Sequence, residues 1–164
     1  MLSRKAACLV LTLGCLTTSP IVSIAHAKSY QTKTPQYLTL RNNGAYTLES
    51  VTVKWKDGSE TLQQKFQANV DSLEAFCVDL SQIKKDGYGI REGSEVWLVA
   101  NIMGGEKESC RKDTKRTYKK SGKIFSQKMS GTTYNNNRCK NNEQLPLDNE
   151  IKSGNSKGCG DGVE

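Results

Sequence analysis

Short stretches of alternating apolar and polar residues, with turn signals about every ten residues, most strongly constrain the fold of this chain. Val51, Val53 and Trp55 occupy every second position of one stretch, and Asp57-Gly58 then supplies the residues of a tight hairpin turn. No apolar pattern with the period of a helix, about 3.6 residues, is long enough to matter. The sequence therefore predicts an all-β fold, an antiparallel β-sandwich of about seven to eight short strands.

The predicted strands follow this alternation, and glycine or charged residues separate them. They span residues 37–41, 45–56, 61–70, 75–80, 95–103, 117–120 and 123–133. The phase of the apolar residues changes after Leu48, which predicts a β-bulge near Glu49-Ser50. Residues 81–94 combine three glycines with acids and bases and are predicted to form a loop. Trp55 and Trp97 fall inside strands, where a tryptophan is more often buried than exposed.

The first 27 residues have the features of a secretory signal peptide. Arg4 and Lys5 precede a short apolar block, and Ala25-His26-Ala27 places small residues at a cleavage site. A membrane-spanning helix would need about 20 apolar residues, and the alternative to a signal is a buried first helix. Cleavage would leave 22 basic and 17 acidic residues and no histidine, which excludes histidine-dependent catalysis and histidine-ligated metals. We therefore expect a secreted or periplasmic protein.

Four cysteines follow the signal, Cys77, Cys110, Cys139 and Cys159. In an exported chain this number predicts two disulfides, for which three connectivities are possible. None of the spacings is Cys-x-x-Cys, so neither a zinc knuckle nor a redox pair is indicated. We favour Cys77–Cys110 within the body of the sandwich and Cys139–Cys159 as a tie on the tail. This tail, residues 135–164, is rich in Asn, Lys and Gly and is predicted to be irregular.

Two short motifs mark the second predicted strand and the last one. Gly44-Ala45-Tyr46 begins a strand that ends in Val53-Lys54-Trp55, and Gly131-Thr132-Thr133-Tyr134 closes the final strand. These motifs resemble the C-terminal domain of the cholesterol-dependent (thiol-activated) cytolysins. The resemblance implies a four-plus-four-stranded β-sandwich domain, here residues 28–134, that docks edge-on to a membrane through loops at one end.

The sequence departs from that family in two places that bear on function. The tryptophan-rich loop around a cysteine has no counterpart near Cys110, where the chain reads Glu106-Lys107-Glu108-Ser109. The Thr-Leu pair with which the family reads sterols would fall on Thr133 and Tyr134, so its second member is changed. The resemblance therefore extends to the fold and to surface binding, and not to cholesterol recognition or pore formation.

Basic residues are concentrated in residues 111–140, which hold ten Lys or Arg and the single acid Asp113. Residues 28–110, by contrast, hold ten bases and eleven acids. We predict that a basic strand pair in this segment binds an anionic lipid or envelope surface, since each Lys or Arg near an anionic membrane contributes about 1 kcal/mol. The alternative is a solvated hairpin whose lysines protect an edge strand from aggregation. The predicted contact residues are Arg111, Lys112, Lys115, Arg116, Tyr118, Lys119, Lys120 and Lys123.

Three other functions remain alternatives. A secreted protein-binding effector or enzyme inhibitor would make its contacts through the turns at residues 42–44 and 87–93. Glycoside hydrolysis by paired carboxylates needs no histidine, and its candidates are Glu49, Glu60, Glu74 and Asp79. Calcium binding at Asp86-Gly87 and Glu92-Gly93 would lack the ligand spacing of known sites. We expect a non-catalytic binding module that uses no cofactor and no metal ion and does not bind nucleic acid.

Overall fold

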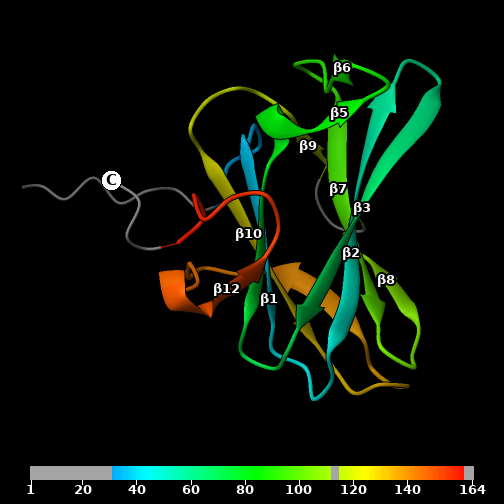
Figure 1. Ribbon diagram of the computed structural model, residues 1–164, viewed down its shortest axis with the longest axis vertical. Coiled ribbons are helices and arrows are strands. Elements are labelled where there is room, and N and C mark those ends of the chain that lie inside the picture. The colour runs from blue at the N-terminus through cyan, green and yellow to red at the C-terminus, as the bar shows by residue number, and fades with distance from the viewer. Residues whose placement is uncertain (1–30, 112–114, 161–164) are drawn as a thin grey trace, which may run out of the picture.

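The computed structural model describes residues 31–111 and 115–160, which form a sandwich of two five-stranded sheets (Figure 1). The predicted signal peptide lies outside the described residues. The strands of sheet A are, in spatial order, β11 (Arg138–Asn141), β10 (Ile124–Ser130), β1 (Tyr37–Asn42), β4 (Ala75–Asp79) and β12 (Ile151–Ser153). Sheet B consists of β3 (Glu60–Val70), β2 (Leu48–Asp57), β7 (Glu95–Ile102) and β8 (Lys107–Ser109), and β9 (Arg116–Thr117) also pairs with β7.

The remaining regular elements are short. Within residues 81–94, where a loop was expected, β5 (Lys84–Lys85) and β6 (Tyr88–Gly89) form a small hairpin. The 3-10 turns are η1 (Leu80–Gln82) and η2 (Asp148–Glu150). In the part of the chain that the structure describes, no helix has the length and apolar character needed to cross a membrane. The predicted all-β class is confirmed.

Two local predictions are confirmed in sheet B. β2 and β3 form an antiparallel hairpin in which Asp57 pairs with Glu60, and Gly58 in the turn has a φ of +62°. Glycine adopts this left-handed conformation without the steric cost that a Cβ would add. The register of β2 shifts between Leu48 and Ser50 against both β3 and β7, which is the predicted bulge.

Sheet A differs from the predicted arrangement because two of its strand pairs are parallel. β1 runs parallel to β10, and β4 runs parallel to β12. Parallel neighbours come from distant parts of the chain, whereas alternation within a strand reports only which face of that strand is buried. The sandwich is therefore confirmed, while a uniformly antiparallel arrangement is wrong for these two pairs.

Alternating apolar side chains from both sheets fill the space between them. Trp55 is 2% exposed and lies in this core, as predicted. Trp97 is also buried, at 8% exposure, but the residues of β7 that join the core are its neighbours Val96 and Leu98, followed by Ala100 and Ile102. Trp97 thus lies on the outer face of sheet B. Fully buried core residues include Leu40, Leu48, Val51, Val53, Val70, Phe76, Val78, Leu98 and Met129.

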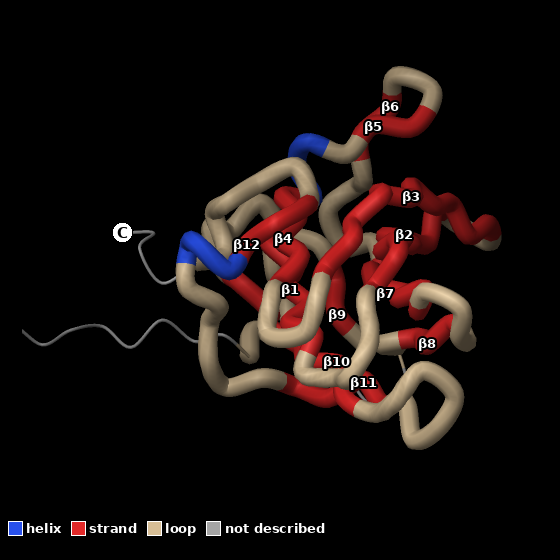
Figure 2. Tube along the Cα trace, turned by 60° about the horizontal axis from the view of Figure 1, so that its bottom comes forward, coloured by secondary structure: helices blue, strands red, loops and turns tan. Residues whose placement is uncertain are grey.

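The tail is more ordered than predicted, because it covers the outer face of sheet A (Figure 2). Ile151 of β12 packs in a second buried cluster with Ile124 of β10 and with Cys77 and Cys159. At Gly154 the tail passes so close to β4 that a Cβ would lie 1.7 Å from the carbonyl oxygen of Cys77. β11 and β12 belong to sheet A, so the sandwich extends beyond the predicted domain boundary at residue 134.

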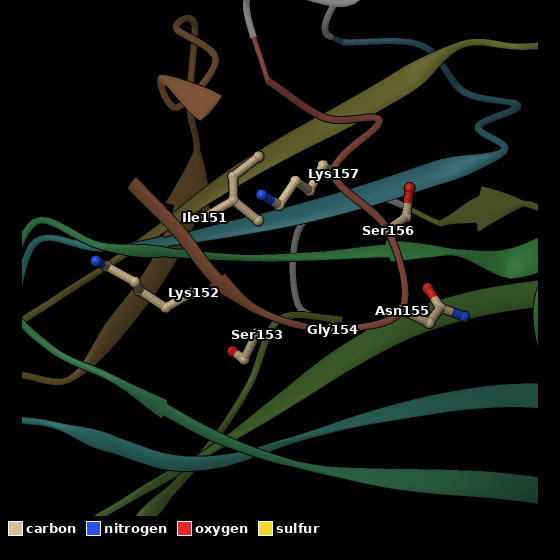
Figure 3. Close-up of a pocket in the computed structure, with 7 residues that line it drawn as sticks. All are labelled: Ile151, Lys152, Ser153, Gly154, Asn155, Ser156 and Lys157. Carbon is tan, nitrogen blue, oxygen red and sulfur yellow. The ribbon is translucent and has the colours of Figure 1, made fainter. Parts of the chain in front are cut away.

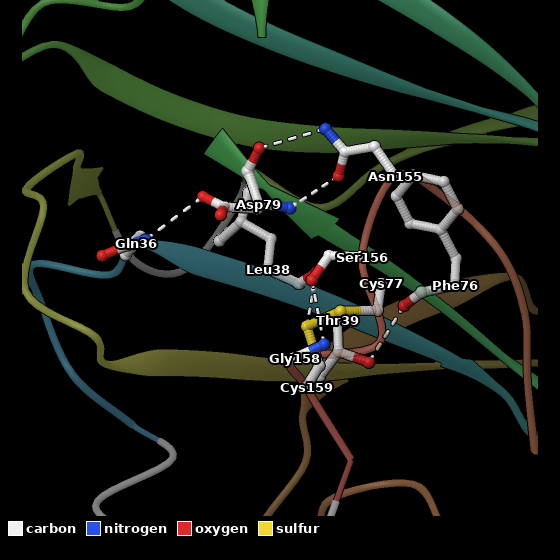
Figure 4. The surroundings of a disulfide bond; sticks show 10 residues. All are labelled: Gln36, Leu38, Thr39, Phe76, Cys77, Asp79, Asn155, Ser156, Gly158 and Cys159. Atoms are coloured by element: carbon white, nitrogen blue, oxygen red, sulfur yellow. Dashed lines mark hydrogen bonds between the residues drawn. A yellow bond between two sulfur atoms is a disulfide. The ribbon is translucent and has the colours of Figure 1, made fainter. Parts of the chain in front are cut away.

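The disulfides are Cys77–Cys159 and Cys110–Cys139, so the predicted pairing was wrong. Phe76 and Val78 point into the core, and Cys77 between them points to the opposite face of sheet A, where Cys159 lies (Figure 4). Cys110, in contrast, lies among the core residues between the sheets. Since the two cysteines are on opposite faces of a strand layer, they cannot meet without rebuilding the sheet.

Further hydrogen bonds fix the end of the tail against β4 (Figure 4). The side chain of Asn155 accepts from the N–H of Asp79 at 2.7 Å and donates to its carbonyl oxygen at 3.1 Å. The carboxylate of Asp79 in turn accepts from Gln36 and from the hydroxyl of Ser81. The tail therefore satisfies backbone groups at the end of a central strand, which explains why it is ordered despite its polar composition.

Candidate functional site

The basic segment 115–123 crosses from one sheet to the other and is not a strand pair. β9 pairs with β7 in sheet B, whereas β10 belongs to sheet A, so the predicted pairing of residues 117–120 with residues 123–133 is wrong. The crossing lies at the end of the sandwich where β1 and β10 begin, which is the upper end in Figure 1. The opposite, lower end carries the β1–β2, β3–β4, β7–β8 and β10–β11 connections.

Arg116 and Tyr118 anchor this segment by pointing inward. Arg116 is 4% exposed, and its guanidinium carbon lies 3.9 Å from the centroid of the Phe125 ring, a cation–π contact. Burial lowers the pKa of Arg116, and burial, followed by the charges of Asp79 and Glu92, raises the pKa of Tyr118. Both residues were predicted to face a partner. They do not, because every second side chain of an extended segment turns to the same side.

Five of the predicted contact residues lie on the surface, namely Arg111 and four lysines, and a fifth lysine joins those four. The N–H of Thr117 donates to the carbonyl of Lys33 at 3.0 Å, and that of Lys119 donates to Pro35 at 3.1 Å. These bonds hold the exposed Lys33 beside the basic segment. Lys33 was not among the predicted contact residues, because no pattern in the sequence around it indicates that residues 31–36 pair with residues 115–123. We call the exposed group the lysine cluster, which consists of Lys33, Lys115, Lys119, Lys120 and Lys123.

Arg111 is held away from this cluster by its own partners. Its guanidinium makes two hydrogen bonds to the Glu95 carboxylate, at 2.8 and 3.0 Å, and lies 4.4 Å from the centroid of the Trp97 ring. The hydrogen bond from Arg111 lowers the pKa of Glu95. Arg111 therefore covers Trp97 on the outer face of sheet B. Lys112, also a predicted contact residue, lies outside the described residues.

The two motifs of the family resemblance meet at the lower end. The N–H of Ala45 donates to the carbonyl of Gly131 at 3.2 Å. Tyr46 is 8% exposed, and its ring lies so close to Gly44 that a Cβ there would fall 2.2 Å from the ring carbon Cζ. Burial, and then the charge of Glu108, raises the pKa of Tyr46 to about 12. Trp55 lies at the other end of β2 and takes no part in this contact.

Exposed apolar side chains also gather on the connections at the lower end. Leu73 is 60% exposed, Met103 is 50% exposed and Tyr134 is 70% exposed. Leu73 has a φ of +71°, a left-handed conformation that strains a residue with a Cβ. Thr132 and Thr133 precede Tyr134 in the same connection, where the hydroxyl of Thr132 bonds backbone groups of the turn. The lower end is thus a second candidate surface, apolar rather than basic.

The carboxylates considered for catalysis have different surroundings. Glu49 accepts a hydrogen bond from Asn101, and Asp79 is buried at the end of β4. Glu74 accepts from the N–H of Asp71 and forms a salt bridge with Lys152, while Glu60 is exposed at the start of β3. Within residues 31–111 and 115–160, no group of three or more His, Cys, Asp or Glu side chains is placed to hold a metal ion.

The surface of the described residues carries several hollows, among them the following three. The first, about 250 Å³, is lined by the consecutive residues 151–157 of the tail (Figure 3). A second, about 450 Å³, lies between the β2–β3 turn and the β5–β6 hairpin and is lined in part by Trp55 and Tyr88. A third, about 210 Å³, lies on the outer face of sheet B among three lysines.

Comparisons with known proteins add little to this picture. No family model matches the chain, and no curated protein matches it. Among solved structures, the chain is similar to one in the structure of a disulfide-locked mutant of intermedilysin, a cholesterol-dependent cytolysin, with human CD59. That similarity has a TM-score of 0.28 and 11% identity, and it covers 66% of this chain and 24% of that chain. It is a weak structural resemblance, and no functional statement follows from it.

Proposed function

We propose that the protein is an exported, non-catalytic module that binds anionic lipid surfaces through its lysine cluster. The observation that carries this proposal is the exposure of five lysines on two hydrogen-bonded segments at one end of the sandwich. None of the salt bridges found within residues 31–111 and 115–160 includes these lysines. The two disulfides favour an oxidising compartment, as expected of an exported protein.

The arrangement favours binding because the segment is anchored while its charges are free. Arg116 and Tyr118 are buried, so the lysines on either side of this pair project from an ordered backbone. At about 1 kcal/mol for each lysine near an anionic membrane, five would supply about 5 kcal/mol at low salt. Salt screens exposed charges, so this attraction should weaken steeply as ionic strength rises.

Co-sedimentation with vesicles tests the proposal. The protein without residues 1–27 would be mixed with neutral phosphatidylcholine vesicles and with vesicles that also contain phosphatidylserine, each at low and physiological salt. The test variant replaces Lys115, Lys119, Lys120 and Lys123 with Gln. The control variant removes the same charge elsewhere, through Arg138→Gln, Lys140→Gln, Lys152→Gln and Lys157→Gln. Circular dichroism would confirm that both variants fold.

We expect salt-sensitive binding to the anionic vesicles alone, lost in the test variant and retained in the control. Equal loss in both variants would mean that only net charge matters, and the cluster would not be the site. Absence of binding to either vesicle would reject lipid as the partner. The protein-binding alternative, through the turns at residues 42–44 and 87–93, would then take its place.

A second candidate is membrane docking through the lower end, favoured by the exposure of Leu73, Met103 and Tyr134. Apolar side chains on loop tips can insert at the headgroup boundary, and that contribution depends little on salt. The lysine cluster lies at the opposite end of the sandwich, so one flat membrane cannot contact both surfaces. Replacing these three residues with Ser would abolish binding in this case, and the lysine variant would still bind.

A further inference from the structure

We propose that the outer face of sheet B binds the sulfate groups of an acidic polysaccharide, at a site separate from the lysine cluster. The site is the hollow of about 210 Å³ that spans β3, β2, β7 and β8. Side chains at every second position of these strands point away from the core and toward this face. The residues that line the hollow include Ser50, Thr52, Lys54, Lys65, Asn101 and Lys107.

Three lysines from three different strands surround the hollow. Lys54 lies on β2, Lys65 on β3 next to Thr52, and Lys107 on β8 next to Asn101. None of the three is in a salt bridge among the described residues. Three ammonium groups around one concave site create a local positive potential that attracts an anion.

The acids beside this face differ in how their charge is compensated. The carboxylate of Glu95 is paired with the guanidinium of Arg111, whereas that of Glu49 accepts a hydrogen bond from the neutral Asn101 Nδ2 at 2.5 Å and keeps its negative charge beside the hollow. Three lysine charges therefore surround the hollow against one uncompensated carboxylate, which leaves a net positive charge. Charge complementarity identifies the occupant as anionic.

An unpaired hydroxyl group in the lining of the hollow also indicates a ligand. Ser50 is 1% exposed, and its Oγ is buried with no hydrogen-bond partner among the described residues. Buried polar groups in proteins are almost always paired, so an unpaired one in the lining of a basic hollow calls for a ligand oxygen or a water. Thr52, two residues along the same face, offers another hydroxyl.

The size of the hollow and the basic residues beyond it indicate that the ligand is a polymer rather than a small anion. Small-molecule sites usually measure about 300 to 1,000 Å³, so a hollow of 210 Å³ suits one sulfate group rather than a whole ligand. Lys56 continues the same face of β2, and Arg111 covers Trp97 beside Lys54. From Ser50 to Lys56 this basic strip extends about 20 Å at ~3.4 Å per residue. A chain with sulfates at intervals can contact the whole strip, whereas a free ion cannot.

Calorimetric titration with a sulfated heparin tetrasaccharide tests this site, with inorganic sulfate and anionic vesicles as further probes. In the test variant Lys54, Lys65 and Lys107 are replaced with Gln. We expect its dissociation constant for the tetrasaccharide to rise about tenfold or more. The matched control, Arg138→Gln, Lys140→Gln and Lys157→Gln, removes the same charge and should stay within about threefold. Ser50→Ala, which keeps the charge, should weaken binding by about threefold to tenfold.

Several results would overturn the proposal. The proposal fails if the tetrasaccharide does not bind, if both triple variants lose binding equally, or if Ser50→Ala binds as the unaltered protein does. It also fails if the protein binds vesicles through Lys54, Lys65 and Lys107 but does not bind the tetrasaccharide. Inorganic sulfate that binds as tightly as the tetrasaccharide would also reject a polymer. The glutamine variant of the lysine cluster should bind the tetrasaccharide normally, so this site and the lipid site can fail independently.

Discussion

At the scale of single residues, Tyr46 shows how a polar side chain can be buried for its ring alone. The ring covers Gly44, and its hydroxyl has no hydrogen-bond partner among the described residues. An unpaired buried hydroxyl costs about 1–3 kcal/mol, which the packing of the ring offsets. The contact also explains why glycine stands at position 44, since any side chain would meet the ring.

Gly44→Ala should therefore destabilise the protein by about 1–3 kcal/mol, because the added Cβ forces the Tyr46 ring to move. Urea unfolding followed by circular dichroism measures the change. Gly89→Ala is the matched control, since its nearest neighbour beyond the adjacent residues is the carbonyl oxygen of Ile83 at 3.7 Å. An equal loss of stability in both variants would contradict the role assigned to Tyr46.

The raised pKa of Tyr46 predicts how stability depends on pH. Tyrosine in the unfolded chain ionises near pH 10, whereas Tyr46 in the folded protein ionises near 12. Its contribution is complete below about pH 10 and is lost as the pH rises toward 12, because the unfolded chain releases its proton first. Tyr46→Phe removes both this dependence and the unpaired hydroxyl. In urea unfolding at pH 7 and pH 11, we expect Tyr46→Phe to lose less stability between the two values than the unaltered protein.

At the scale of elements, the alternation of apolar and polar residues predicts which side chains are buried, but not which other element covers them. In the strand predicted at residues 75–80, Phe76 and Val78 alternate with Cys77, and the structure places the first two in the core and Cys77 on the other face. Because the core lies between two sheets, this alternation is inconsistent with a Cys77–Cys110 disulfide. What it could not show is that the polar tail covers that outer face, because Ile151 and Cys159 are isolated in a sequence without periodicity.

Removing either disulfide should have a distinct local effect. Loop-closure entropy assigns about 4.5 kcal/mol to Cys77–Cys159, which closes 82 residues, and about 3.6 kcal/mol to Cys110–Cys139, which closes 29. Replacing Cys77 and Cys159 with Ala should also release the tail from sheet A. Hydrogen exchange would then rise first in β12 and at Asp79, whose N–H bonds Asn155.

The Cys110→Ala and Cys139→Ala pair serves as the comparison. This disulfide joins the end of β8 to β11, the outermost strands of their sheets, so its loss should raise exchange there and leave β12 protected. If both pairs raised exchange in the same strands, the disulfides would not have the separate roles described above.

At the scale of the whole molecule, the basic segment could be found from composition, but its geometry could not. The ten bases in residues 111–140 mark this segment in the sequence, and four of its lysines lie on the surface in the structure. Alternation turns Arg116 and Tyr118 inward, and Glu95 binds Arg111, so three of the eight predicted contact residues are engaged within the protein. The order of strands in a sheet depends on contacts between distant parts of the chain. The sequence pattern therefore shows neither that residues 115–123 cross between the sheets nor that Lys33 lies beside them.

Truncation after Tyr134, the predicted domain boundary, should therefore prevent folding. The shortened chain lacks β11 and β12, both edge strands of sheet A, and one partner of each disulfide. We expect it to lose the β-sheet signal in circular dichroism and to be digested rapidly by trypsin. A chain that ends at residue 160 keeps both disulfides and should resist the protease as the complete protein does. A folded and resistant product after truncation at 134 would contradict the contribution of the tail.

Both disulfides join a cysteine in the body of the sandwich to one near the end of the chain, which has a consequence for biogenesis. If the chain is exported in amino-to-carboxyl order, as proposed, Cys77 and Cys110 reach the oxidant before either native partner has emerged. Oxidation at that moment would link the two residues that the finished sheet keeps on opposite faces. Recovery would require thiol–disulfide exchange, a slow step that an isomerase accelerates. We therefore expect the yield of native protein to depend on a disulfide isomerase more than on an oxidase alone.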